Sequence, residues 1–363
     1  MKIAIIGTRG YLSRYSGIET ATTQAAVLLA KKGYELVFYC QSKSAVPHLK
    51  LPQGIRIVSI NTINRKHLAT FLHVLFSTLH VLFTDVNIVH YHALGPSFFA
   101  LLPRLVGKKT VVTVHALDWR RKKWKYYAKS FLRICEYSAN FLPNKTIVIS
   151  RVLKHYFESK FKKAVYYIPN GINIPGLADN VCQPPVHYIL FVGRIVPEKG
   201  IDCLIKAFNG IQANIRLLIA GGPGFMHSYL SYIKSVACTN SRIEFLGAVD
   251  TITLQSLYSN AYLFVLPSEV EGLSVSLQEA MSYGRCVLAS DIPESREALE
   301  ECGFYFKTGD FIDLRNKVQY LIDNPGIVSK TGLKARELVK RKYCWDKVIN
   351  DLDELYQSLQ INK

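Results

Sequence analysis

Short runs of apolar and β-branched residues alternate with helical patterns along the whole chain. The runs are uniformly apolar, as expected for strands of a parallel sheet that helices cover on both faces. In the first half they predict strands at Lys2–Gly7, Glu35–Cys40, Ile55–Ile60, Val86–His92, Thr110–His115, Thr146–Ser150 and Val165–Ile168. In the second half they predict strands at Tyr188–Val192, Arg216–Ala220, Arg242–Leu246, Tyr262–Leu266, Val287–Ala289 and Phe304–Phe306. Each half is therefore expected to be a doubly wound, Rossmann-like α/β unit.

A segment rich in proline, glycine and asparagine, from Pro169 to Pro185, separates the two series of strands and marks a linker. We expect an N-terminal domain over residues 1–171, a linker over 172–186 and a C-terminal domain over 187–344. Residues 345–363 are expected to form a closing helix that packs back on the N-terminal domain. Two such domains that face each other across a cleft would bind a ligand outside the carboxyl ends of their strands.

The charge of the chain lies in its first half. The 363 residues include 45 Lys and Arg against 27 Asp and Glu, a net charge of +18, and residues 1–170 hold 26 of the basic and 6 of the acidic residues. Such an excess indicates an anionic partner or surface. The eight cysteines contain no CxxC pair and are expected to be reduced thiols rather than zinc ligands. The reduced thiols predict a cytoplasmic protein, and the sequence predicts no signal peptide and no membrane span.

The loop after the first strand, from Gly7 to Glu19, is rich in glycine, and glycine N–H groups at a helix start can approach a phosphate. Gly17 and Glu19 either contact a ligand there or belong to a simple strand-to-helix turn. His92 and His115 each end a predicted strand. They either hydrogen-bond sugar hydroxyls or a leaving phosphate, with a pKa near neutrality, or are buried, satisfied imidazoles. We expect His90 to point to the opposite face from His92.

Two segments of the second half carry the charged candidates. Arg194 and Lys199 flank a turn that opens a helix, which suits the binding of a diphosphate; the alternative is a solvated surface turn. Glu271 follows the strand Tyr262–Leu266, and Glu279 lies in a helix that starts near Ser274. A rise of roughly 10 Å between them allows one carboxylate to hold a sugar and the other a ribose. The alternative is a capped helix with one solvated and one buried, paired glutamate.

In this order and spacing, the segments resemble the retaining glycosyltransferases of family 4, which have the GT-B fold. The resemblance also includes Pro169-Asn170-Gly171, Gly221-Gly222-Pro223 and Phe245-Leu246-Gly247. The N-terminal half, through Tyr15–Glu19, His92–Pro96 and Thr113–Trp119, resembles a bacterial subgroup that contains rhamnosyltransferases. It departs from that subgroup at Ser16, where a second glycine is usual.

The resemblance implies a role for each candidate. Arg194 and Lys199 would bind the donor diphosphate, beside Gly193, and Glu279 would bind the ribose. The donor sugar would contact Glu271 and the N–H groups of Gly272, Leu273 and Ser274, and the base would lie at Leu246 and Gly247. His115 would lie near the reacting carbon or a sugar hydroxyl. The diphosphate or acceptor would be contacted by Gly17, Glu19, His92 and Asp118.

The resemblance further implies same-face attack assisted by the leaving diphosphate, with cations in place of a metal and no cofactor. Asp351 and Asp353 match the string Asp-x-Asp but are expected on the solvated face of the closing helix. Cations interleaved with an aromatic residue, at Arg120, Arg121, Lys122, Lys123, Trp124 and Lys125, suit an anionic membrane surface; the alternative is a solvated basic helix face.

These observations predict a metal-independent hexosyltransferase. It would move a sugar from a nucleotide-diphosphate sugar to a glycan or a polyprenyl-diphosphate-linked acceptor in capsule or O-antigen synthesis. The resemblance to the subgroup implies rhamnose as the sugar. It would bind peripherally to the inner face of the plasma membrane. A sugar-nucleotide epimerase or a phosphorylase of the same fold is the nearer alternative. A basic nucleic-acid-binding protein is the more distant one, because no recognition motif for DNA or RNA is present.

Overall fold

The computed structural model describes residues 1–8, 10–11, 17–41, 51–62, 68–121, 124–176, 188–224 and 227–361. The chain divides into two compact units, one of Met1–Gly171 with Trp345–Lys363 and the other of Ile172–Cys344. Residues 177–186 of the predicted linker lie outside the described residues, as do residue 187, Arg9 and residues 12–16 of the first loop. Among the described residues, no helix is both long and apolar enough to cross a bilayer.

The described part of the first unit contains a parallel sheet of seven strands in the order β3-β2-β1-β4-β5-β6-β7. The strands are β1 Lys2–Ile6, β2 Glu35–Gln41, β3 Ile55–Ile60, β4 Ile88–His92, β5 Lys109–Val114, β6 Lys145–Val148 and β7 Tyr166–Tyr167. The helices are α1 Gly17–Lys31, α2 Leu68–Leu82, α3 Leu94–Ser97, α4 Leu101–Leu105, α5 Tyr126–Phe141, α6 Arg151–Phe161 and α14 Trp345–Ile361.

The described part of the second unit contains a parallel sheet of six strands in the order β10-β9-β8-β11-β12-β13. The strands are β8 Tyr188–Val192, β9 Arg216–Ala220, β10 Ile243–Gly247, β11 Leu263–Leu266, β12 Cys286–Ser290 and β13 Phe304–Phe306. The helices are α7 Ile201–Phe208, α8 His227–Ala237, α9 Thr251–Asn260, α10 Val275–Ser282, α11 Pro293–Leu299, α12 Phe311–Asp323 and α13 Pro325–Tyr343. A strand occurs at each of the thirteen predicted positions, so the expectation of two doubly wound units is confirmed.

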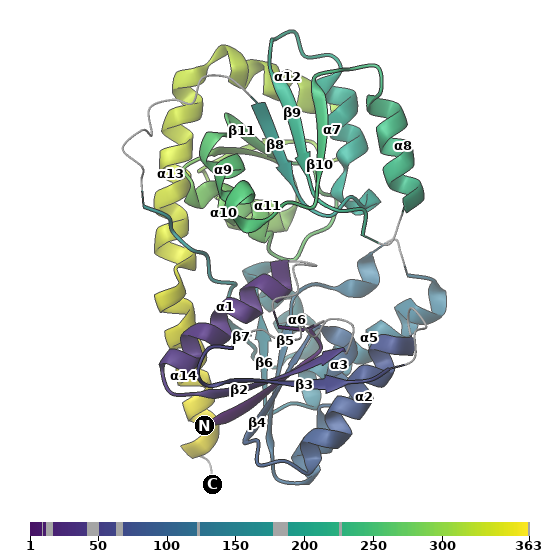
Figure 1. The fold of residues 1–363 in the computed structure, drawn as a ribbon, viewed down its shortest axis with the longest axis vertical. Helices are drawn as coiled ribbons and strands as arrows, with labels where there is room; N and C mark the ends of the chain where they lie inside the picture. The colour runs from purple at the N-terminus through teal and green to yellow at the C-terminus, as the bar shows by residue number, and fades with distance from the viewer. Residues whose placement is uncertain are drawn as a thin grey trace. The chain divides into compact units, whose positions relative to one another are not determined.

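Each sheet has helices on both faces (Figure 1). In the second unit, alternate residues of the central strands pack against α7, α8 and α12 to form one apolar core. In the first unit, α1 and α14 pack against one face, while α2 faces the other, where its Thr78 and His80 hydrogen-bond Tyr91 and Tyr39. Helices cover both faces of each sheet because the strands carry apolar side chains on both sides.

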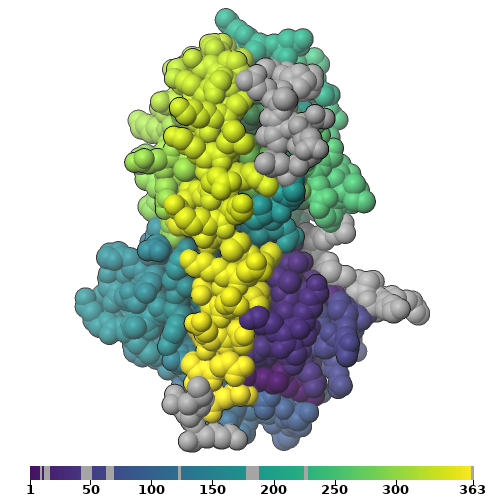
Figure 2. Space-filling model, turned by 90° about the vertical axis from the view of Figure 1, so that its left-hand side faces the viewer, coloured from purple at the N-terminus to yellow at the C-terminus, as the bar shows by residue number. Residues whose placement is uncertain are grey.

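The closing helix α14 belongs to the first unit, where it lies beside α1 (Figure 2). Its apolar face, including Ile349 and Leu352, joins the core under the sheet. Asp353 accepts a hydrogen bond of 2.5 Å from the Tyr34 hydroxyl and forms an ion pair with Lys32 at 2.9 Å. Asp353 keeps 27% of its side chain exposed, and through these contacts it also attaches the helix to the segment between α1 and β2.

We expect Ile349→Ala to lower the free energy of unfolding of the first unit by about 2–5 kcal/mol, because it leaves a cavity in this core. Urea unfolding measures the change. Glu354→Ala, on the exposed side of the same helix, is the control and should change the free energy by less than about 0.5 kcal/mol. Equal effects of the two substitutions would contradict the packing of α14.

Candidate functional site

In the second unit, the candidate residues gather where the order of the strands reverses. β8 lies between β9 and β11, because the chain first adds β9 and β10 on one side and then crosses to the other. In open α/β sheets, ligands bind outside the carboxyl ends of the strands at such a point. The loop after β8 carries Arg194 and Lys199, and the loop after β11 carries Glu271.

Backbone contacts bind the ends of β8, β9 and β10 tightly together. The Gly193 N–H donates to the Ala220 carbonyl at 3.0 Å, and the Gly221 N–H donates to the Gly247 carbonyl at 2.7 Å. A Cβ on Gly221 would lie 1.8 Å from the Gly193 carbonyl oxygen, so no other residue fits there. The structure thus brings Gly193 and Gly247 together through Gly221, and it leaves a surface of bare backbone at this edge.

The loops after β8 and β11 are also joined through their backbones. The Glu269 N–H donates to the Glu198 carbonyl at 2.9 Å. A Cβ on Gly200, whose φ is +63°, would lie 2.1 Å from the Pro267 carbonyl oxygen. This close approach places Lys199, the neighbour of Gly200, against the loop that follows β11.

Lys199 and Glu271 form an ion pair at this junction, between Nζ and Oε1. Both side chains are mostly enclosed, with 14% and 12% of their surfaces exposed. Ion pairs are screened less when they are partly buried, so each of these charges holds the other in place. Arg194 is half-buried on the same loop. The predicted association of cations and acids in one cluster is thus observed for Lys199 and Glu271.

The N-terminus of α10 follows directly. The Ser274 hydroxyl accepts a hydrogen bond of 3.4 Å from the Leu277 N–H and caps the helix. Leu273 and Ser274 are buried, and Gly272 is half-buried. The capped helix that the sequence offered as an alternative is therefore present, with Glu271 just before it.

Glu279 lies one turn into α10, in an aromatic environment. Its Oε2 accepts a hydrogen bond of 2.9 Å from the Tyr258 hydroxyl, and the Tyr258 ring stacks on Tyr283 with centroids 5.6 Å apart. Burial raises the pKa of the Glu279 carboxyl to about 7, against the opposing effect of the Tyr258 hydrogen bond. Sequence reasoning missed Tyr258, because it lies 21 positions away on α9 with no motif around it.

In the first unit, two predicted histidines meet at the ends of β4 and β5. Nδ1 of His92 lies 3.0 Å from Nε2 of His115, and both rings are buried. A Cβ on Gly7 would lie 2.4 Å from the His92 carbonyl oxygen, so the end of β1 joins this cluster. Burial holds the pKa of His92 down to about 4 and that of His115 well below its ordinary value. The expectation of pKa values near neutrality is therefore wrong, and at pH 7 the pair is uncharged.

His90 lies on the same face of the sheet as His92, which corrects the prediction that it faces the other way. Residues two positions apart in a strand point to the same side. The two imidazole rings stack with centroids 4.4 Å apart and an angle of 26° between their planes.

The remaining candidates are spread along the first unit. Gly17 begins α1, and Glu19 is buried in its first turn. Asp118 pairs with Arg121 at 3.4 Å, and Arg120 is exposed with its guanidinium 5.5 Å from the centre of the Trp119 ring. Lys125 is exposed and Trp124 half-buried, whereas Lys122 and Lys123 lie outside the described residues. Arg121 is thus engaged within the protein rather than directed outward.

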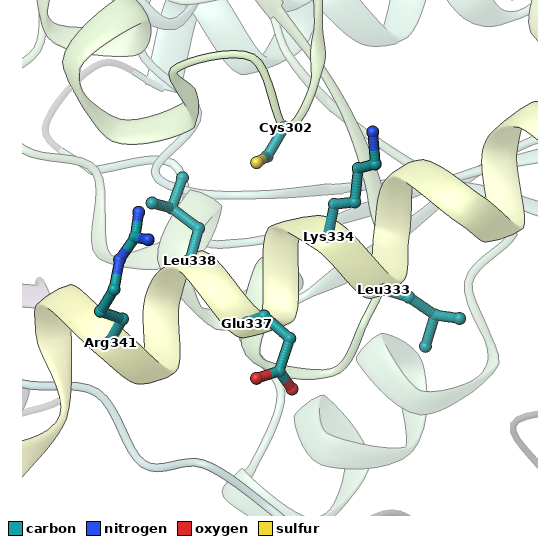
Figure 3. Close-up of a pocket in the computed structure, with 6 residues that line it drawn as sticks. All are labelled: Cys302, Leu333, Lys334, Glu337, Leu338 and Arg341. Carbon is teal, nitrogen blue, oxygen red and sulfur yellow. The ribbon is translucent and has the colours of Figure 1, made fainter.

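A hollow of about 540 Å³ lies elsewhere in the second unit, between α13 and the loop before β13. Leu338 and Lys334 extend toward the side of Cys302, while Glu337 extends away from it (Figure 3). Because Cys302 precedes β13 in a parallel sheet, it lies at the edge opposite to the ends of β8 and β11. Burial raises the pKa of its thiol. The hollow is therefore separate from the edge that carries Lys199 and Glu271 by its position in the sheet.

No three His, Cys, Asp or Glu side chains gather as metal ligands in the part of the chain that the structure describes. The candidate site of the second unit contains cations, carboxylates and backbone groups. Such groups bind anions and hydroxyls.

The raised pKa of Glu279 predicts a pH dependence of stability. Because the folded protein retains a proton that the unfolded chain releases, the free energy of unfolding should fall as pH rises from about 4.5 to about 7, by up to about 3 kcal/mol. Glu279→Gln should remove this part of the fall in urea unfolding at pH 5 and pH 8. Glu354→Gln, on the exposed side of α14, should retain it. An unchanged pH dependence in Glu279→Gln would contradict the assignment.

Two family models match the chain. The model described as Glycosyltransferase Family 4 matches residues 15–174, and the model described as Glycosyl transferases group 1 matches residues 186–324. An uncharacterized glycosyltransferase of Methanocaldococcus jannaschii is 24% identical over 86% of this chain and 84% of its own length. A capsular polysaccharide biosynthesis glycosyltransferase, CapM of Staphylococcus aureus, is 27% identical over 65% of this chain and 67% of its own length.

Solved structures share the whole fold. Sucrose-phosphate synthase from Thermosynechococcus elongatus has a TM-score of 0.86 at 20% identity and covers 100% of both chains. HepE from Anabaena, solved in complex with UDP and glucose, has a TM-score of 0.81 at 16% identity over 99% of this chain and 100% of its own. With its two doubly wound sheets and its two matching family models, the chain is a GT-B glycosyltransferase similar to family 4.

Proposed function

We propose that the chain transfers a sugar from a nucleotide-diphosphate sugar to a glycan or lipid-linked acceptor, with retention at the anomeric carbon. One observation carries this proposal: the enclosed pair Lys199–Glu271 lies beside the bare backbone of Gly193 at the strand reversal of the second unit. A diphosphate needs cations and N–H donors, and a sugar needs a carboxylate acceptor. The HepE structure, whose title names UDP and glucose, supports the same class of donor.

Each candidate site residue of the second unit then has a role. Arg194 and Lys199 bind the diphosphate, while Glu271 and the N–H groups at the start of α10 bind the sugar hydroxyls. Glu279 accepts a ribose hydroxyl, with Tyr258 fixing its carboxylate. The base lies against the Leu246–Gly247 backbone, where glycine leaves room for a flat ring.

The mechanism is electrostatic. As the bond to the sugar breaks, one further negative charge develops on the departing nucleotide diphosphate, and Arg194 and Lys199 stabilise it without a metal ion. The acceptor hydroxyl attacks from the face that the nucleotide leaves, and the leaving phosphate oxygen takes its proton. The overall result is one glycosidic bond made, one sugar–phosphate bond broken and the configuration kept.

We expect Arg194→Ala and Lys199→Ala each to lower kcat/KM for the donor by about 10²–10³-fold, because each removes a group that stabilises the transition state. Initial rates with a panel of nucleotide sugars measure the loss. Lys206→Ala, an exposed lysine of α7, is the matched control and should retain the rate.

The same assay tests the metal-independent mechanism. Activity should persist in EDTA, and a complete loss that added Mg²⁺ or Mn²⁺ reverses would contradict it. Wild-type rates in both site variants would overturn the assignment of the donor site.

We further propose that the first unit attaches to an anionic membrane and takes a lipid-linked acceptor there. The exposed face of α5 carries five apolar or aromatic side chains beside the exposed Arg133, and all five are at least half exposed: Tyr126, Tyr127, Ile134, Tyr137 and Phe141. These residues are termed the α5 stripe. Aromatic and apolar side chains with nearby cations favour the interface of a bilayer. CapM, named for capsular polysaccharide biosynthesis, supports an acceptor of the surface polysaccharide class. Rhamnose as the sugar rests on the resemblance to the subgroup.

The protein should co-sediment with vesicles of anionic phospholipid at low ionic strength and dissociate as salt rises. Replacing Tyr127, Ile134 and Phe141 together with serine should weaken binding by at least tenfold, because buried apolar area is lost. Tyr320→Ser, at an exposed tyrosine of α12, should bind as wild type does. A failure of the wild-type protein to bind these vesicles at low salt would contradict the proposed membrane attachment.

A further inference from the structure

Three histidine rings of the first unit form one buried column. His90 stacks on His92 with centroids 4.4 Å apart, and the His92 and His115 rings meet edge to edge through their shared hydrogen bond, with centroids 5.3 Å apart and 20° between the planes. The column spans the carboxyl ends of β4 and β5, with all three rings 6% exposed or less. Three imidazoles in contact, away from water, cannot all carry charge. Burial lowers the pKa of each, so the column is neutral at pH 7.

His90 is held at both of its nitrogens. Its Nδ1 lies 2.7 Å from the Tyr356 hydroxyl of α14, and its Nε2 lies 2.7 Å from the Thr113 hydroxyl of β5. Either hydroxyl can donate or accept, so both bonds form in either tautomer of His90. Two hydrogen bonds at opposite edges of the His90 ring fix the orientation of its plane. The His92 ring stacks on this plane.

His92 and His115, by contrast, each use only one ring nitrogen in a hydrogen bond to the described residues. Nε2 of His92 and Nδ1 of His115 are buried and have no hydrogen-bond partner among the described residues. The two rings share one hydrogen bond, so in a neutral pair one ring donates and the other accepts. The second nitrogen of the donating ring is then bare, and the second nitrogen of the accepting ring carries a proton. The pair therefore offers one donor and one acceptor, which match a neutral hydroxyl group rather than a phosphate.

We propose that Tyr356 and Thr113, acting through His90, are positioning residues that hold the neutral His92–His115 pair in place to bind a sugar hydroxyl. The inference rests on the proposed function and adds residues to it, one of them from the closing helix. The backbone at Ala93, directly after His92, has a φ of +76°, a strained value for a residue other than glycine. Such strain persists only where the surroundings fix the conformation, and here the Ala93 N–H donates a hydrogen bond of 2.9 Å to the Thr113 carbonyl.

The test is Tyr356→Phe, which removes one hydroxyl and keeps the ring. We expect kcat to fall by about tenfold, the loss of one neutral hydrogen bond, with KM for the nucleotide sugar unchanged. Long-range ¹H–¹⁵N spectra of the imidazoles should show altered tautomer populations for His92 and His115. Thr113→Val, which removes the hydroxyl, should lower kcat and alter the imidazole spectra. Thr113→Ser, which keeps a hydroxyl, should retain both.

The chain offers a matched control. Tyr39 and His80 form an equivalent bond, 2.9 Å between the hydroxyl and Nδ1, on the opposite face of the same sheet. Tyr39→Phe should leave kcat and the His92 and His115 signals unchanged. Wild-type kcat and imidazole spectra in folded Tyr356→Phe, or equal effects of the two tyrosine substitutions, would overturn the inference. A protein that transfers no sugar would contradict the proposed function instead, while the spectra would still test the column.

Discussion

The constraint on which the second unit depends is the close approach of backbone to backbone at the strand reversal. Gly221 touches the Gly193 carbonyl, and Gly200 touches the Pro267 carbonyl. Side chains at these two positions would force the loops apart. Because the loops after β8 and β11 meet, Lys199 reaches Glu271 and the charges that the chemistry needs are assembled on rigid strand ends.

The two units provide opposite electrostatic environments. The second combines an enclosed cation–carboxylate pair with backbone N–H groups, which suits a ligand that carries and gains negative charge. The first, although it holds the basic excess of the chain, has a neutral histidine column at its strand ends. Its cations lie instead outside the column, some of them among aromatic rings such as Trp119. The division fits an enzyme that binds an anionic donor and a hydroxyl-bearing acceptor.

The fold was predictable because each strand is a local apolar run, and the thirteen runs have the length and spacing of a parallel sheet. Lys199 and Glu271 were predictable from charged residues at strand ends. Tyr258, Thr113 and Tyr356 were not, because their partners lie 21 or more positions away and only packing joins them. The pKa values of His92 and His115 depend on burial of the two rings against each other, which no local pattern encodes. The predicted orientation of His90 was wrong, although the two-residue period of a strand already places it on the same face as His92.

The central claim is that the edge of the second unit formed by Gly193, Lys199 and Glu271 binds the diphosphate of an activated sugar. The most direct measurement is the shift in unfolding free energy across a panel of nucleotide-diphosphate sugars and the corresponding nucleosides. A matching nucleotide sugar at 100 times its Kd should stabilise the protein by about 2.7 kcal/mol, whereas its nucleoside, which lacks the phosphates, should have little effect. Stabilisation by nucleoside and nucleotide sugar to the same extent, or by no member of the panel, would contradict the account.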